Sequence, residues 1–273
     1  DESGGPEAAL LRTVEKRDAD ELTTGITLQH TLLPWWEYNI QLSLYDRREH
    51  SDSPGVAPGV RDPVGIPPNM TDSTLRRTDV IVRHLFSIAR GVQCALGGDG
   101  QFEDGASDGS LRLGMVTIPH RFALSRTTLS PFFEAQLSPA PGLLVQGGVR
   151  VDWPRHFDAK ASPRVGASYT LGVTHTTVRA NWGEGFHLPS FFALGHPIVG
   201  NRNLLPETSH SVDAGVSQAL WAQRLNLGVT YFSSTLNNLI DFDPGPPPPP
   251  RQPLCRHSAG SGNVSQRAPM AAS

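Results

Sequence analysis

Four acidic side chains are the first candidates for chemistry in this sequence. The glycine-rich stretch GGDGQFEDGASDGS carries Asp99, Glu103, Asp104 and Asp108 close together. Clustered carboxylates can bind Ca²⁺, but this spacing does not match the calcium loop of an EF-hand. We therefore favour a solvated acidic loop over a calcium site.

Histidines gather in a second region. His187, His196 and His210 lie in or beside the segment 183–206. Because imidazole is a common metal ligand, these side chains could contact a metal-chelate ligand that reaches the segment. Histidines scattered through one loop are more often incidental, and this spacing defines no metal site.

The sequence carries none of the common signatures of enzymatic catalysis. The sequence contains no nucleophile elbow, phosphate-binding loop, zinc signature or dinucleotide fingerprint. Its two cysteines, Cys94 and Cys255, lie far apart, so a disulfide stays open. We favour a small apolar filler at Cys94 and an incidental thiol at Cys255. The sequence predicts no enzyme, no cofactor and no metal site, and it leaves the binding residues unknown.

The overall composition narrows the class of protein further. The 273 residues carry a formal net charge of −3, with a pI near 6.4. This near-balance of charge gives no sign of the strongly basic surface that nucleic-acid binding requires. No apolar run reaches the ~18 residues of a membrane-spanning helix, and the start DESGGPEAALLRTVEKRDADEL has no signal-peptide pattern. The 27 glycines and 24 prolines indicate many turns.

Alternation of apolar and polar residues dominates the chain and predicts β-strands. In PRVGASYTL, Val165, Ala167 and Tyr169 share one face, whereas Arg164 and Ser168 share the other. The pattern predicts about ten strands, at residues 21–32, 36–47, 74–88, 91–102, 120–137, 143–153, 163–171, 175–182, 207–220 and 224–241.

Short turns and long polar loops alternate between these strands. The expected long loops span 48–73, 103–119, 154–162, 183–206 and the residues after Asp241. Antiparallel neighbours joined in this way place every short turn at one end and every long loop at the other. Outer-membrane barrels have this plan. The predicted fold is therefore all-β: an antiparallel up-and-down transmembrane β-barrel, partial, with about ten strands.

A soluble β-sandwich, whose strands also alternate, is the main structural alternative. Several predicted strands have the nine to twelve or so residues that a tilted membrane strand needs. All five tryptophans lie at predicted strand ends, where the bilayer interface would be: Trp35, Trp36 and Trp221 beside short turns, Trp153 and Trp182 beside long loops. These features favour the barrel.

With the strands and loops placed, a family resemblance emerges. The segments TTVRANWGEGFHLPSFFALG, GNRNLLPETSHSVDAGVSQAL and LNLGVTYFSSTLNNLIDFDP resemble the late barrel of TonB-dependent outer-membrane receptors. The resemblance is close over residues 160–243, looser over 20–160 and absent after Pro244. The matching residues are Gly183, Glu184, Gly185, Phe186, Pro189, Ser190, Gly200, Asn201, Leu204, Pro206, Glu207, Tyr231, Phe232, Asn238, Leu239 and Ile240.

The resemblance gives the segment 183–206 a role. It implies an external loop that folds down across the barrel mouth, with Phe186, Phe191 and Phe192 packed on neighbouring loops or the rim. Proline and glycine would shape a path that no strand ladder could take. On the lumen face, Arg150, Arg164 and Arg179 are expected to pair with Asp152, with Glu134 or with a plug domain rather than with substrate.

The resemblance also implies a function for the full-length parent. Such a receptor takes up a metal chelate of the siderophore or vitamin B12 type across the bacterial outer membrane, with energy from the TonB complex. The implied partners are outer-membrane lipid, the TonB complex and a small metal-chelate ligand, with no nucleic acid. A self-contained passive barrel (a pore or adhesin) and a soluble β-sandwich binding domain remain as alternatives.

The sequence lacks several expected parts of such a receptor. We recognise no signal, TonB-contacting box or plug, and plugged transporters have about 22 strands. The sequence therefore predicts a truncated fragment without transport activity of its own. Its expected parts are a poorly structured lead-in at 1–20, a barrel segment at 21–243 and a Pro-rich, low-complexity and disordered tail at 244–273, native or frameshifted.

Overall fold

The computed structural model describes residues 14–56, 65–221, 224–242, 264–267 and 270–272, and almost all of them lie in β-strands. Eleven strands form one antiparallel sheet in the order β1-β2-β3-β4-β5-β6-β7-β8-β9-β10-β13, and β11 pairs with β12 separately. The elements are β1 (Lys16–Leu33), β2 (Trp36–Ser53), β3 (Asn69–Ala89), β4 (Val92–Leu113), β5 (Val116–Ala140), β6 (Leu143–Pro154), β7 (Lys160–Leu171), β8 (Thr176–His187), α1 (Phe191–Gly195), β9 (Glu207–Leu220), β10 (Leu225–Asn237), β11 (Leu239–Phe242), β12 (Val264–Arg267) and β13 (Met270–Ala272).

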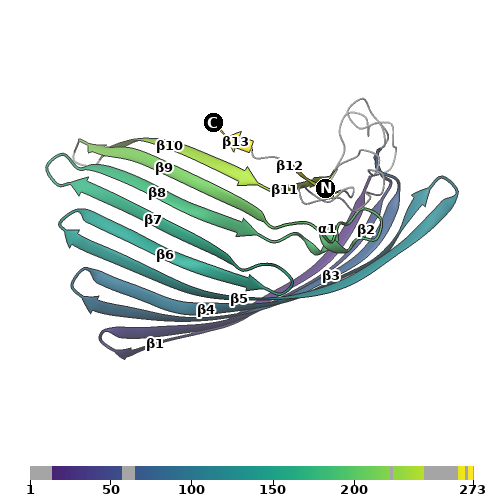
Figure 1. Cartoon of the computed structure of the whole chain (residues 1–273), viewed down its shortest axis with the longest axis horizontal. Coiled ribbons are helices and arrows are strands. Elements are labelled where there is room, and N and C mark those ends of the chain that lie inside the picture. The colour runs from purple at the N-terminus through teal and green to yellow at the C-terminus, as the bar shows by residue number, and fades with distance from the viewer. Residues whose placement is uncertain (1–13, 57–64, 222–223, 243–263, 268–269, 273) are drawn as a thin grey trace, which may run out of the picture.

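The sheet is curved and open. Each of the first ten strands pairs with the next one along the chain, which is an up-and-down arrangement. In Figure 1 the strands bend around a concave side, and α1 lies within that curve. Within the described ranges, β1 and β13 form the two edges of the sheet. The predicted partial, up-and-down antiparallel barrel is confirmed.

All ten predicted strands exist, and several are longer than the alternation indicated. The turns at one end are short, as predicted; two of them contain Gly91 (φ 76°) and Gly142 (φ 79°). A Cβ on Gly142 would lie 2.3 Å from the carbonyl oxygen of Thr170. Glycine is therefore required at this turn both by its positive φ and by this contact.

The predicted long loop at 103–119 is wrong. Strands β4 and β5 continue through it and meet at a turn around Gly114 (φ 61°). The acidic residues favour this extended ladder because arginines lie across it: Arg77 and Arg126 face Glu103, and Arg121 faces Asp108. The loops at 48–73 and 154–162 also shrink, to residues 54–68 and 155–159.

The convex face of the sheet carries an apolar band. Many of the side chains that point outward in this band are apolar and exposed. They include Leu22, Ile26, Leu28, Ile40, Leu42, Leu44, Phe102, Leu129, Phe133, Val149, Trp153, Val165, Tyr169, Val178, Trp182, Val212, Val216, Val229 and Tyr231. On β2 this band runs from Trp36 to Leu44, close to the length a tilted membrane strand needs.

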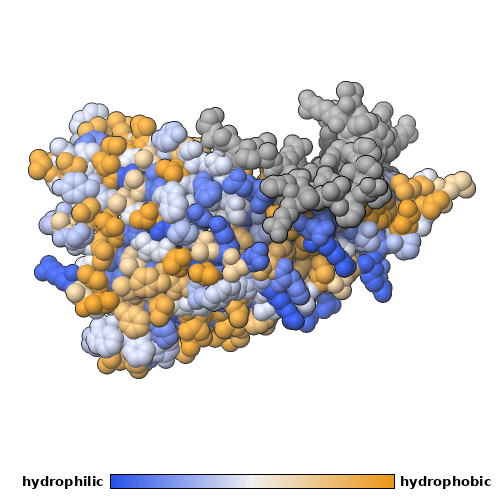
Figure 2. Space-filling view, viewed as in Figure 1, coloured by the Kyte–Doolittle hydropathy of each residue, from blue (hydrophilic) through white to orange (hydrophobic). Residues whose placement is uncertain are grey.

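The described residues contain almost no conventional hydrophobic core. Ala95, Ala193 and Leu204, together with Pro154 and Pro189, are the buried apolar side chains among them. A β-sandwich would bury the facing residues of two packed sheets, whereas here one sheet exposes its apolar side chains. In Figure 2 apolar colours cover much of the surface near the short turns, and strongly hydrophilic side chains stand out over β4 and β5 nearer the other end.

Aromatic side chains cluster on this face beside the short turns. Trp35 and Trp36 stack on Phe86, with ring centroids 6.3 and 6.0 Å away. The Trp36 indole N–H donates to Nδ1 of His84 over 3.2 Å. A ring with one apolar and one hydrogen-bonding side suits the edge of a bilayer.

Within the described ranges, no helix has the length and apolar character needed to cross a membrane. The predicted lead-in at 1–20 and the Pro-rich tail at 244–273 fall mostly outside the described residues, although β1 already begins at Lys16.

Candidate functional site

The segment 188–206, here called the mouth loop, connects β8 to β9 and lies on the concave side of the sheet (Figure 1). It contains the single turn of helix α1, which begins after Ser190. The Ser190 hydroxyl accepts a hydrogen bond from the backbone N–H of Ala193, 3.1 Å away. Serine is a preferred residue at this capping position because its oxygen satisfies a free helix N–H.

The mouth loop has a small core of its own. Ala193 and Leu204 are buried together, and Leu194 and Ile240 pack against them. The backbone N–H of Asn201 donates to the carbonyl oxygen of Ala193 over 2.7 Å, which closes the loop on itself. A folded loop of this kind satisfies its own backbone groups, as a compact surface loop must.

The end of the mouth loop is tied to the strand that follows the next hairpin. The carboxylate of Glu207 accepts from the backbone N–H of Ile240 at 2.7 Å. The Asn238 side-chain amide donates to the carbonyl oxygen of Pro206 at 3.3 Å, and Asn238 adopts φ 56°. These residues are motif positions of the predicted family resemblance, and their contacts are structural.

One arginine joins the mouth loop to the sheet wall. Arg126 of β5 donates from Nη1 to the carbonyl oxygen of Pro189 over 2.9 Å. Its guanidinium also lies 4.8 Å from the ring centroid of Phe191, a cation–π contact. Pro189 itself is fully buried. Arg126 therefore holds both the backbone and the first aromatic residue of α1.

Glu103 holds Arg126 in place. Its side chain is 2 % exposed and contacts Arg77 and Arg126, at 2.7 Å each. Two guanidinium groups on one buried carboxylate satisfy its charge and most of its lone pairs. The prediction of a solvated acidic loop is therefore wrong for Glu103, which is a buried ion-pair centre on the inner face of the sheet.

The other three residues of the acidic stretch separate. Asp99 contacts Arg150 at 2.9 Å on the inner face. Asp108 contacts the exposed Arg121 on the convex face. Asp104 alternates with Glu103 and so points outward. Among the described residues, no three His, Cys, Asp or Glu side chains come together in a group that could hold a metal ion.

Glycines make room for the aromatic residues of the mouth loop. A Cβ on Gly105 of β4 would lie 2.3 Å from Cδ2 of Phe191. A Cβ on Gly195 would lie 2.8 Å from side-chain atoms of both Phe122 and Leu124 of β5. The expected packing of this loop on the barrel rim holds for Phe191 and α1, which lie directly against the inner wall. The expectation is wrong for Phe192, whose side chain is 51% exposed.

A pair of buried histidines forms the second contact between the mouth loop and the wall. The rings of His120 and His196 lie 4.5 Å apart, and Phe192 lies 4.8 Å from His196. The backbone N–H groups of Ile198 and Val199 donate to Nδ1 of His196, at 3.3 and 3.2 Å. Nδ1 is thus an acceptor, which requires the neutral ring.

Burial determines the charge state of this pair. Desolvation, with a smaller contribution from the neighbouring His120, lowers the pKa of His196 to about 4. Desolvation also lowers the pKa of His120, and the Asp108 carboxylate opposes that change only in part. Both rings lie beyond the level of the apolar band, at the end of the sheet where the mouth loop packs. Both are neutral at pH 7.

The three histidines singled out from the sequence do not converge. His187 contacts Glu207 at 3.2 Å, and His210 contacts Glu184 at 3.5 Å, both on exposed sides of β8 and β9. Only His196 is buried, and its neighbour is His120, which the sequence did not single out. A shared site for a metal chelate on these three side chains does not form.

The mouth loop should detach from the sheet wall in acid. Because the pKa of docked His196 is about 4, below its usual 6.5, the docked loop keeps its full stability above pH 6.5 and loses it as the pH falls toward 4. The loss is on the order of 3 kcal/mol. Hydrogen exchange of the Gly200 and Asn201 amides, corrected for intrinsic pH dependence, measures it.

A matched pair of variants separates this effect from general acid instability. His196→Asn keeps an acceptor near the Nδ1 position and cannot titrate, so the part of the pH dependence that comes from His196 should disappear. His187→Asn, at an exposed histidine, should leave it unchanged. An unchanged pH profile in His196→Asn would contradict the assignment.

Arginines on the inner wall are mostly paired, as predicted. Arg150 contacts Asp152 at 2.8 Å, and Arg164 contacts Glu134. Arg179 instead donates to the hydroxyl of Thr230 over 2.9 Å. The inner face is therefore a layer of compensated charges, which suits a water-filled lumen better than an apolar core.

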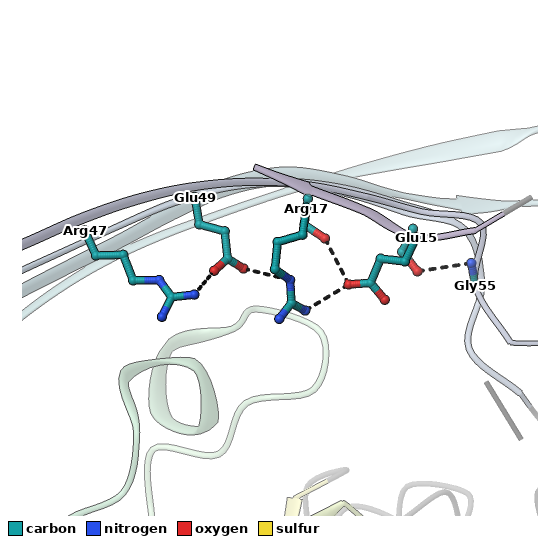
Figure 3. A network of polar contacts seen from close by, with 7 residues as sticks. Glu15, Arg17, Arg47, Glu49 and Gly55 are labelled. Carbon is teal, nitrogen blue, oxygen red and sulfur yellow. Dashed lines mark hydrogen bonds and ion pairs between the residues drawn. The ribbon is translucent and has the colours of Figure 1, made fainter. Parts of the chain in front are cut away.

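The same pattern extends to the first two strands. Figure 3 shows Arg47 and Arg17 on either side of Glu49, with Glu15 on the far side of Arg17. Arg17 contacts Glu49 at 3.3 Å and Glu15 at 2.8 Å. These residues alternate with the outward-facing Leu22, Leu42 and Leu44 and so belong to the inner face.

Two hollows lie along the wall near these charges. One, of about 410 Å³, is lined by Arg83, Glu134, Gln146, Arg164 and Asn181 among others. The second, of about 460 Å³, includes Phe132, Arg150, Ser162 and Phe186. The Ser162 hydroxyl oxygen and one Asp99 carboxylate oxygen are buried without a hydrogen-bond partner in the described structure.

A family comparison identifies the chain's relatives. The family model described as "TonB dependent receptor-like, beta-barrel" matches residues 3–267. A curated relative, the vitamin B12 transporter BtuB of Photobacterium profundum, is 30% identical over 99 residues. That match covers 36% of this chain and 16% of the relative.

Solved structures share the fold at low sequence identity. A Serratia marcescens hemophore receptor HasR, in complex with its hemophore HasA and heme, gives a TM-score of 0.70 at 18% identity, covering 96% of this chain and 46% of the receptor. The Pseudomonas aeruginosa PAO1 receptor FpvA bound to pyoverdine gives 0.66 at 16% identity, with 84% and 38% covered. The chain thus spans less than half the length of these receptors.

Proposed function

The chain belongs to the TonB-dependent receptor β-barrel family, whose barrels are outer-membrane proteins, and from this premise we propose that it forms part of a receptor for energy-coupled uptake of a metal chelate. The chelate would be of the siderophore or vitamin B12 type. The mouth loop is the observation that carries this proposal, because its contacts with Arg126 and Gly105 fold it inward over a polar, charge-compensated wall.

The named relatives support the class of ligand. One is a vitamin B12 transporter, one a hemophore receptor complexed with heme, and one is bound to pyoverdine. A transporter named for copper, OprC, also shares the fold, at a TM-score of 0.65 and 14% identity. Metal-containing cargo is common to most of these names, and the proposal goes no further than that class.

We propose a separate role for each part of the chain. Residues 21–243 would supply a section of barrel wall, and 244–273 a Pro-rich tail. Because the described sheet is open, we propose that other strands close the barrel and that a plug meets the inner wall at Arg83, Arg164 and the hollow around them. The TonB complex would act on the full-length parent.

Uptake in cells tests the proposal. In the bacterium of origin, deletion of the reading frame that contains this chain should abolish accumulation of one labelled metal chelate, and an uncoupler of the inner-membrane potential should abolish it equally. Cells that express residues 1–273 alone should accumulate none. Uptake that persists in the presence of the uncoupler would instead mark a passive pore and overturn the proposal.

A further inference from the structure

Two rows of outward-facing side chains lie immediately above the apolar band. The backbone register places Asp46, Arg76, Asp104 and Ser125 side by side across β2 to β5. The next row up consists of Arg48, Thr74, Ala106 and Ala123. Because alternate residues share a face, these rows follow Leu44 and Phe102 on the same convex surface.

The two rows form a groove. It has a volume of about 690 Å³, and both rows contribute to its lining. Four of the eight side chains, Thr74, Ala106, Ala123 and Ser125, are small, so the surface between the charged residues is hollow. The groove contains two arginines and two aspartates and is therefore neutral overall.

The two arginines are held so that their outer ends remain available. Arg48 and Arg76 each contact Asp46 through Nε, at 3.5 and 3.1 Å. Their side chains are 71% and 65% exposed. Within the described part of the chain, no hydrogen bond to their terminal Nη groups is made. A guanidinium with free Nη groups can bind a phosphate with two parallel hydrogen bonds.

Arg121, on the same face, is an arginine whose guanidinium is already hydrogen-bonded on both sides. It donates to Asp108 from both Nε and Nη2, so its fork is filled. It is 79% exposed and lies farther from the apolar band. The three arginines therefore have similar exposure and the same charge. They differ in whether the terminal Nη groups of the guanidinium are already hydrogen-bonded to a carboxylate.

We infer that this groove binds the phosphorylated sugar headgroup of an outer-leaflet glycolipid. The depth fits, because the acyl chains of such a lipid would cover Leu44 and Phe102 while its headgroup reaches the first charged row. The arginine forks take the phosphate. Asp104, Thr74 and Ser125 can hydrogen-bond the sugar hydroxyls, which explains why carboxylates share the groove. The inference depends on the membrane placement of the family and not on the chelate proposed above.

Lipid binding by the purified protein of residues 1–273 tests the inference. Detergent-solubilised protein is mixed with lipid A, a bis-phosphorylated acylated disaccharide, or with the same lipid lacking phosphates, and bound lipid is counted by native mass spectrometry. Wild type should bind the phosphorylated form at least 10-fold more tightly. The double variant Arg48→Gln/Arg76→Gln should lose that preference, and Arg121→Gln should keep it.

A charge-preserving variant separates the guanidinium fork from simple positive charge. Arg76→Lys preserves the charge but not the fork, so it should weaken binding severalfold in a protein with unchanged circular dichroism. Equal binding of both lipids, or an unchanged double variant, would overturn the inference. Displacement of the lipid by millimolar inorganic phosphate would also overturn it, because the groove would then be a site for soluble anions.

Discussion

Glu103→Ala is expected to lower the free energy of unfolding by about 3 kcal/mol, because it leaves two guanidinium groups without their shared carboxylate. Glu103 is 2 % exposed and Arg126 12 % exposed, so water replaces little of the lost interaction. Arg77 is 40 % exposed and recovers part of its solvation, which places the effect at the lower end for buried pairs. Urea denaturation of the full chain in detergent micelles measures the change.

The mouth loop should respond more strongly than the sheet. Without Glu103, Arg126 is no longer fixed beneath Pro189 and Phe191. Tryptic cleavage after the exposed Arg202 in this loop should therefore speed up by roughly tenfold for each 1.4 kcal/mol of lost docking energy. The cleavage rate reports docking separately from global unfolding.

An ion pair on the opposite face provides the control. Asp108→Ala removes the partner of Arg121, but these side chains are 54% and 79% exposed. Exposed pairs contribute about 0–1 kcal/mol, so both readouts should stay close to wild type. Equal effects of the two substitutions would show that burial of Glu103 has no energetic consequence and would contradict the argument.

Gly105→Ala is the second substitution with a large expected effect. The new Cβ would lie 2.3 Å from Cδ2 of Phe191, well inside van der Waals contact. Overpacking of this kind costs about 1–3 kcal/mol. The ring must leave the wall and would lose its contact with Arg126, so cleavage after Arg202 should accelerate about tenfold or more.

Gly98 on the same strand gives a matched control. A Cβ there meets no atom within 4 Å, so Gly98→Ala should be neutral or slightly stabilising through the reduced entropy of the unfolded chain. The double variant Gly105→Ala/Phe191→Leu, with a smaller side chain, should recover part of the docking. If Gly98→Ala and Gly105→Ala accelerate cleavage equally, steric conflict with Phe191 is not the cause.

The sequence around Glu103 favours a loop, although this residue lies buried in the sheet. In sequence, Glu103 and Asp104 are adjacent carboxylates in a glycine-rich segment, which is typical of a loop. In the sheet they point to opposite faces, and Arg77 and Arg126, both more than twenty residues away in sequence, surround only Glu103. Local composition carries no information about such cross-strand partners, and the same limitation concealed Arg126 and His120.

The sequence by itself determined what depends on short-range patterns: the ten strands through their alternation, the short turns at one end, the apolar convex face and the family motif around Pro189 and Asn201. These follow from side-chain periodicity and turn chemistry, which a few neighbouring residues specify. Only the tertiary structure decided that β4 and β5 extend through an acidic segment, that Gly105 makes room for Phe191, and that His196 is buried against His120. Each of these depends on strand register, which brings residues distant in sequence into contact and is fixed by the whole sheet.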